Sequence, residues 1–272
     1  MKKSSSEMPE VELWAKLTTL DGIASSEIAA AGANGCFDQR STRQIYDEDY
    51  SVLNPQKLAE KKEILFRETS GKGHGSVLDQ SCFTYVIEDV PRSTTLFLCG
   101  PQYLSHLQQS LRRATADRGF VLTGDDWEVG EGFSLVGGLG GVEKLLDSSF
   151  EFYQKMSADG IPGEDARYIL PLATRTNILT SGDARELMHL HWLSEQPGVP
   201  SVTKKVVGEM IDQAAREEPE LMKRRDNNYE ALAWMPSPIL FAKANKSLED
   251  HFENYWLKSV MLLDSTSFYL AD

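Results

Sequence analysis

The residues best suited to chemistry are polar side chains concentrated within residues 73–120 and continued further along the chain. Arginine presents a planar fork of donors that matches a phosphate group, and glutamine offers the paired donor and acceptor that the edge of a pyrimidine ring requires. These side chains are Gln108, Gln109, Ser110, Arg112, Arg113 and Arg118, followed later by Arg167 and Arg185. The set predicts a site for a planar anionic ligand such as a mononucleotide. The alternative is that single arginines form ordinary surface pairs with acidic residues.

Other kinds of active site have little support in the sequence. His189 and His191 are two residues apart, so they would point in different directions on a helix, which makes a zinc site a poor hypothesis. Cys82 lies in an apolar segment, which lacks the activating environment of a nucleophile. Cys99 lies beside a helix end and is a possible nucleophile, although a cysteine in such a place more often serves packing. The sequence contains no G-x-S-x-G motif, and the glycine run at 137–141 matches no phosphate-binding motif. We therefore expect no bound metal and no covalent nucleophile.

The composition restricts the class of protein and of partner. The chain has 272 residues, of which 41% are apolar, enough for one large domain or two small ones. Its formal net charge of −13 disfavours binding to a nucleic-acid polymer, whereas a few focused arginines suffice for one phosphate. We find no apolar run of about 18 residues and no signal peptide, so we expect neither membrane insertion nor secretion. The odd number of cysteines, 3, favours a reducing compartment, the cytoplasm.

The elements that must hold these side chains alternate between helix and strand. Strands are predicted at residues 10–16 and 82–90, which alternate or are rich in β-branched and aromatic residues. Glycines in residues 71–77 predict left-handed bends that bring His74 and Ser76 together. Pro91 predicts the start of a helix that ends at Gly100. Further helical segments are predicted at residues 20–37, 54–68, 102–118, 142–160 and after Pro200, and two helical pieces at 161–195, the second capped by Asp183.

Two segments of the chain carry recognisable motifs: HGSVLDQSCFTYVIEDVPR and GIPGEDARYILPLATRTNILTSGDAREL. The first resembles the His-x-Ser/Thr-x-x-Glu segment and following strand of the flavin-dependent thymidylate synthases, and the second resembles their later Ala-Arg-x-x-Leu-Pro and Ala-Arg-x-Leu region. Together they cover roughly residues 70–195 in the family's order. The resemblance implies an α+β fold, a mixed sheet with a helical bundle. It also implies a single domain over residues 1–272, with a glycine-rich insertion near 121–141 and a helical C-terminal part.

The resemblance also implies an activity and an assembly. The chain would form a homotetramer that binds FAD and dUMP between subunits. It would convert dUMP to dTMP by reductive methylation, with methylenetetrahydrofolate as the donor and NADPH as the reductant. Two alternatives stay open: a C5-methylase of UMP or another pyrimidine nucleotide on the same fold, and a non-catalytic paralogue that binds a nucleotide or a partner subunit.

Site residues follow from the resemblance position by position. The cofactor would be bound by His74, Ser76, Asp79 and Arg113. The substrate would be bound by Gln108, Gln109, Ser110, Arg112 and Arg185, with Ser110 and Arg112 also the predicted catalytic residues and Arg185 on the phosphate. The chain departs from the family at Cys99-Gly100-Pro101, where an Arg-His-Arg triplet is expected, and at Leu193-Ser194, where Leu-Arg is expected. Arg112, Arg113 and Arg118 are the candidates to replace the missing charge.

Overall fold

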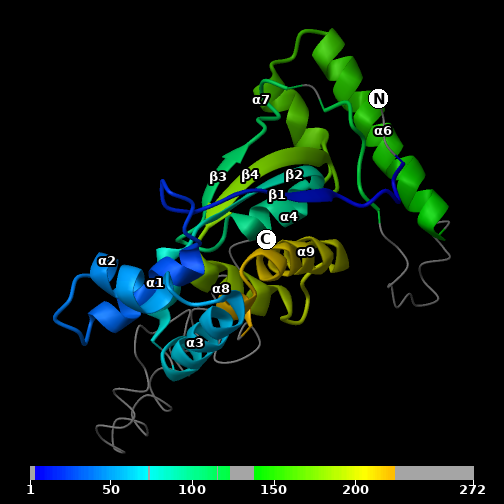
Figure 1. The fold of residues 1–272 in the computed structure, drawn as a ribbon. Coiled ribbons are helices and arrows are strands. Elements are labelled where there is room, and N and C mark those ends of the chain that lie inside the picture. Colours follow the sequence, from blue (N-terminus) through cyan, green and yellow to red (C-terminus); the bar gives the residue numbers. More distant parts are fainter. Residues whose placement is uncertain (1–3, 73, 115, 123–137, 224–272) are drawn as a thin grey trace, which may run out of the picture.

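The computed structural model describes residues 4–72, 74–114, 116–122 and 138–223. Its centre is a four-stranded sheet, flanked by helices, in which every strand pair is antiparallel (Figure 1). The strands lie in the order β1-β2-β4-β3: β1 (Glu10–Lys16), β2 (Phe83–Pro91), β3 (Ser105–Gln108) and β4 (Arg175–Gly182). The predicted α+β class is confirmed, as are the two predicted strands, β1 and β2.

The helices differ widely in length. The long ones are α1 (Ser25–Gly35), α3 (Pro55–Glu68), α6 (Gly138–Ala158), α8 (Ala184–Ser194) and α9 (Ser201–Glu217). The short ones are α2 (Thr42–Ile45), α4 (Arg92–Leu98), α7 (Gly163–Ala166) and α10 (Pro219–Met222). A π-helical turn spans Tyr46–Tyr50, and 3-10 turns span Ser70–Lys72, Gly75–Gln80 and Arg167–Ile169. Among the described residues, no helix is both long and apolar enough to cross a bilayer.

The main hydrophobic core lies between one face of the sheet and the helices α1, α3, α8 and α9, which gather on the same side of it (Figure 1). Phe83, Tyr85 and Ile87 alternate along β2 and are all fully buried in this core. The Tyr85 hydroxyl donates a hydrogen bond of 2.9 Å to the carbonyl of Met210 in α9, so the one polar atom of this ring is satisfied. Burying each such side chain contributes about 1.5–3 kcal/mol.

The other face of the sheet carries apolar side chains that belong to neither hydrophobic core of the described residues. Val86 in β2 is paired with Leu179 in β4, and Leu179 is paired with Leu107 in β3, so the three form a row across the sheet. Leu107 is 74% exposed, and Trp14 in β1 is 64% exposed. This row therefore offers an apolar surface for a further contact.

A second, smaller core lies around α6, which stands at one end of the sheet away from the other long helices (Figure 1). Phe120, Phe150, Tyr153 and Ala166 form its buried centre. The helix predicted at 142–160 is confirmed, but it starts at Gly138, so the end of the predicted glycine-rich insertion is helical. Residues 123–137 and 224–272, which include most of that insertion and the predicted helical C-terminal part, lie outside the described residues.

Two strands contradict the helical predictions. The segment that was expected to be the first helical piece of 161–195 contains β4, which pairs with both β2 and β3. Similarly, the segment 102–118 contains β3 followed by turns instead of a helix. β4 was not predicted because it contains polar residues whose hydrogen-bond partners lie on other strands. For example, the Ser181 hydroxyl oxygen lies 2.9 Å from that of Thr84 in β2.

Candidate functional site

His74 and the Gly75–Gln80 turn, which carry the predicted cofactor-binding residues His74, Ser76 and Asp79, form the predicted flavin turn. This turn lies against the first turn of α8. The Nη1 of Arg185 donates to an Asp79 carboxylate oxygen at 3.0 Å, and the two residues form an ion pair. A Cβ added at Gly75 would lie 3.1 Å from the Nε of Arg185. The predicted left-handed bends are wrong at Gly75, which has a negative φ within a 3-10 turn. A glycine is favoured at residue 75 because the Arg185 side chain crosses directly over it.

The turn presents polar side chains outward and anchors itself with an apolar one. His74 is half-buried, and Ser76 and Asp79 are exposed. Leu78, in contrast, is fully buried in the main core. Ser76 is therefore accessible to a ligand from solvent, and His74 is partly accessible.

Asp183 caps α8, as predicted. Its carboxylate accepts a hydrogen bond of 2.8 Å from the backbone N–H of Glu186. Burial raises the pKa of Asp183 to about 6, and the negative charges of Asp79 and Glu186 add to the effect, whereas the cap hydrogen bond and Arg185 oppose it. A buried contact of 3.1 Å joins a carboxylate oxygen of Glu186 to Nδ1 of His189 on the next turn. The Asp183 carboxyl is therefore expected to titrate near pH 6.

We expect Asp183→Asn to make the protein more stable at pH 8 and to change little at pH 4. Asparagine keeps the helix cap without the cost of a buried charge. The folded-state pKa of about 6 lies above the ordinary value of 3.8. Between these values the folded state keeps a proton that the unfolded state has released, so the wild type loses stability as pH rises through this window and does not regain it above.

Urea unfolding at both pH values measures this effect. The gain at pH 8 should be on the order of 1–3 kcal/mol, because one pKa unit corresponds to about 1.4 kcal/mol. Asn54→Asp, at the exposed cap of α3, is the matched control and should show no comparable pH-dependent difference. Equal stability of wild type and Asp183→Asn at pH 8 would contradict the assignment.

The predicted nucleotide loop is a tight turn directly after β3. The backbone N–H of Gln109 donates to the carbonyl of Asn177 at 2.9 Å, which ties the loop to the start of β4. The backbone N–H of Arg113 donates to the carbonyl of Ser110 at 3.1 Å, and that of Arg112 donates to the Ser110 hydroxyl at 3.3 Å. The backbone thus fixes the spacing of the predicted Ser-x-Arg pair.

Two of the polar residues in this region have structural partners. The Gln108 amide donates to the Thr95 hydroxyl at 2.7 Å, which links β3 to α4. Arg118 forms an ion pair of 2.9 Å with Asp89, a buried residue that has a φ of 55° at a bulge in β2. The guanidinium of Arg118 is therefore paired with a buried carboxylate, which leaves Arg112 and Arg113 as the sequence-based candidates for replacing the missing charge.

The nucleotide loop lies against the segment that carries Arg167. A Cβ added at Gly163, at the start of α7, would lie 2.9 Å from the carbonyl oxygen of Arg112. Leu111 packs against the second core together with Leu170. The structure therefore brings Ser110, Arg112, Arg113 and the Arg167–Ile169 turn to one end of β4.

Within one chain, this end is separate from the end that carries Arg185. Gln109 is bonded to Asn177 at the start of β4, whereas Arg185 follows the last residue of the strand, Gly182. A strand advances about 3.3 Å per residue, so the two groups are roughly 15–20 Å apart. The predicted substrate-binding set is thus divided, and Arg185 lies with the predicted flavin residues instead of with Ser110 and Arg112. The predicted cofactor-binding set is divided too, because Arg113 lies in the turn with Ser110 and not beside Asp79.

The positions where the charged family residues are absent have ordinary local roles. Cys99 ends α4 and is exposed, as is Gly100. Ser194 is fully buried, and its hydroxyl donates to the carbonyl of His191 at 2.7 Å. Burial raises the thiol pKa of the half-buried Cys82. The thiol of Cys99 is also partly desolvated, although the residue as a whole is exposed, and its pKa is raised in spite of the opposing charge of Arg92. A raised pKa disfavours the thiolate that a nucleophile requires.

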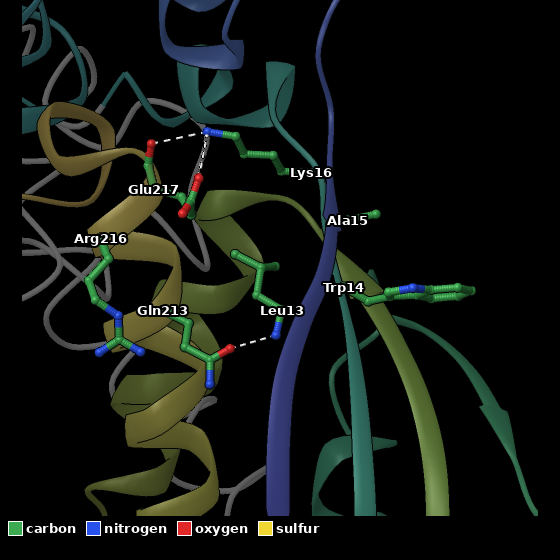
Figure 2. Close-up of a pocket in the computed structure, with 7 residues that line it drawn as sticks. All are labelled: Leu13, Trp14, Ala15, Lys16, Gln213, Arg216 and Glu217. Carbon is green, nitrogen blue, oxygen red and sulfur yellow. Dashed lines mark hydrogen bonds and ion pairs between the residues drawn. The ribbon is translucent and has the colours of Figure 1, made fainter.

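Two hollows lie apart from these groups. One, of about 610 Å³, lies between the start of α4 and the start of α9. The other, of about 410 Å³, lies between β1 and α9. Here the Gln213 side chain accepts a hydrogen bond of 2.5 Å from the backbone N–H of Leu13 (Figure 2). Neither is lined by a predicted site residue. In the described ranges, no group of three or more His, Cys, Asp or Glu residues is placed to hold a metal ion.

Comparison with known proteins identifies the family. The sequence model described as "Thymidylate synthase complementing protein" matches residues 22–220, well over half of the chain. The chain belongs to this family. The flavin-dependent thymidylate synthase of Geobacter sulfurreducens is 33% identical over 130 residues, covering 44% of this chain and 51% of that protein. That of Sulfurisphaera tokodaii is 27% identical over 164 residues, covering 60% and 62%. The chain therefore aligns with about half to three fifths of each.

The same fold is found among solved structures. The UMP/dUMP methylase PolB from Streptomyces cacaoi, bound with 5-Br dUMP, superposes with a TM-score of 0.63 at 18% identity, covering 82% of this chain and 97% of PolB. The expected fold is confirmed. The sequence alone did not reveal the contact between Asp79 and Arg185, because it joins residues 106 positions apart and no local pattern signals it.

Proposed function

We propose that the protein is a flavin-dependent thymidylate synthase that converts dUMP to dTMP with methylenetetrahydrofolate and NADPH. The observation that carries the proposal is the contact of Arg185 with Gly75 and Asp79. It joins the two segments that resemble the family, although they are far apart in the sequence. Membership of the thymidylate synthase complementing protein family also supports the proposed activity.

The residues around this contact fit FAD. Ser76 offers an exposed hydroxyl, His74 a half-buried imidazole, and Arg185 a guanidinium whose side chain is 19% exposed, so the set can donate to the oxygens of a flavin ring or its phosphates. In our proposal these residues and Asp79 hold the cofactor. Bound FAD would supply the hydride chemistry, and the chain would orient it and exclude water.

The nucleotide would be held at the other end of β4. Ser110 and Arg112 would bind its phosphate and ring, with Arg113 beside them, and the free amide of Gln109 suits the pyrimidine edge. The raised thiol pKa of Cys99 is consistent with a reaction that uses no cysteine nucleophile. The fixed turn after β3 would keep these donors in one geometry, which is what catalysis by positioning requires.

A complete site would then form between subunits, because the two halves lie at opposite ends of β4 in one chain. The apolar row of Val86, Leu179 and Leu107 on the open face supports such an association. We propose a homotetramer of single-domain chains in the cytoplasm. The three cysteines, which are all free thiols, accord with that location.

The second candidate is C5-methylation of UMP on the same fold. It is favoured by PolB, which is described as a UMP/dUMP methylase and superposes in complexes with both 5-Br dUMP and 5-Br UMP. The non-catalytic alternative, a nucleotide- or partner-binding paralogue, is favoured by Cys99-Gly100-Pro101, which replaces the charged triplet.

Ligand binding separates these candidates. The purified protein should show flavin absorbance, or acquire it with FAD, and dUMP should raise its melting temperature more than UMP does, since a bound ligand stabilises the folded state. A larger shift with UMP would favour the second candidate. Protein that takes up no flavin would count against both enzymes.

A further inference from the structure

Arginines without an ion pair gather at one end of this acidic protein. The chain has 41 acidic and 28 basic residues, so carboxylates are abundant. Six described arginines accordingly form ion pairs: Arg40, Arg43, Arg67, Arg118, Arg185 and Arg216. Within the described residues, five arginines form none: Arg92, Arg112, Arg113, Arg167 and Arg175. The buried Arg175 guanidinium donates to backbone carbonyls instead. Arg112, Arg113 and Arg167 belong to the end of β4 described above.

Arg92 is held at the same end by its backbone. It is the first residue of α4, and its N–H donates to the carbonyl of Thr174 at 3.0 Å. The next N–H, that of Ser93, donates to the carbonyl of Leu172 at 3.0 Å. These bonds fix the first turn of α4 against the segment that follows the Arg167–Ile169 turn.

The two side chains interact through their charges. Arg92 is half-buried; burial lowers the pKa of its guanidinium, and the positive charge of Arg167 lowers it further. Two cations that repel one another in a partly desolvated position are stabilised by an anion between them. The positive charge of Arg92 also lowers the thiol pKa of Cys99, against the raising effect of desolvation. Arg92 therefore places positive charge near residues 99–101, where the charged triplet is absent.

We propose that Arg92 and Arg167 together bind a phosphate group, and that Arg92 supplies the positive charge that the family places at residues 99–101. The inference rests on the proposed function for the identity of the ligand. The phosphate of the pyrimidine nucleotide is the favoured source, because the Ser110–Arg113 turn lies against the segment that carries Arg167. The predicted flavin turn, by contrast, lies at the opposite end of β4 in the same chain.

Arg92→Met tests the charge while keeping an apolar stem of similar length. Titrations of the full-length protein with dUMP, deoxyuridine, FAD and inorganic phosphate separate the possible sources. We expect Arg92→Met to weaken dUMP about 10–100-fold, as loss of a charge-assisted pair does, and to leave deoxyuridine and FAD unchanged. Arg92→Lys should recover part of the dUMP affinity, because it restores the charge without the planar fork.

Arg67→Met is the matched control, since Arg67 is an exposed arginine paired with its neighbour Glu68; it should bind every ligand as the wild type does. If the wild-type protein binds no nucleotide, the proposed function itself is contradicted. Wild-type affinity for dUMP in Arg92→Met would overturn only this inference. A selective loss of FAD, or of inorganic phosphate without dUMP, would overturn the nucleotide as the source.

Discussion

Equal amounts of Arg112→Ala and Arg185→Ala protein, each inactive alone, should together recover about a quarter of the wild-type activity after subunit exchange. Each substitution should lower kcat/KM at least about 100-fold, because it removes a charge-assisted contact to a bound ligand. In a mixed oligomer, some sites take their Arg112 half from one subunit and their Arg185 half from another, and both halves are then intact. Thymidylate formation before and after mixing measures the recovery.

The matched control is a mixture of Arg112→Ala with Ser110→Ala. Both residues lie in the same turn, joined by a 3.3 Å hydrogen bond, so every site would carry a defect in the same half. This mixture should stay inactive. Equal activity in the two mixtures, or none in either, would contradict a site shared between subunits.

Arg175→Ala is expected to lower the free energy of unfolding by about 3 kcal/mol, because the buried carbonyl of Asp89 left unpaired costs about 1–3 kcal/mol and the loss of a buried side chain leaves a cavity. Arg175 is 2% exposed. Its Nη1 donates to the carbonyl of Asp89 at 3.0 Å, and its Nη2 donates to the carbonyls of Ser4 and Glu7 at 2.7 and 2.6 Å. One guanidinium thus ties the segment before β1 to the bulge in β2.

Urea unfolding measures the loss. Arg67→Ala is the control, since its exposed pair with Glu68 should contribute less than about 1 kcal/mol. Arg175→Lys should be intermediate, because an ammonium group cannot reproduce the fork that reaches three carbonyls. A loss of under about 1 kcal/mol in Arg175→Ala would mean that the three carbonyls find other partners.

Local patterns in the sequence predicted the elements whose stability is largely local. β2 and α3 are examples: β2 combines aromatic and β-branched residues, and α3 has Asn54 as its cap and Pro55 at its first position. β4 escaped prediction because it is rich in Thr, Asn and Ser, whose partners lie on other strands. Its stability comes from pairing on both sides, which a single segment does not reveal.

The candidate residues came from the sequence, but their arrangement did not. Sequence motifs nominated Asp79, Ser110 and Arg185 as site residues, and the sequence grouped Arg185 with Ser110. The structure separates these two by the length of β4 and joins Arg185 to Asp79. Arg92 gave no signal in the sequence, because its significance depends on Arg167 and on the absence of a nearby carboxylate among the described residues.

The most direct test of the central claim is a product analysis. Protein reconstituted with FAD is incubated with dUMP, methylenetetrahydrofolate and NADPH, and the nucleotide is examined by mass spectrometry. We predict dTMP, formed only when all three are present with the flavin, and no dTMP from Arg112→Ala. Flavin-loaded protein that binds dUMP and leaves it unmethylated under these conditions would contradict the proposed activity.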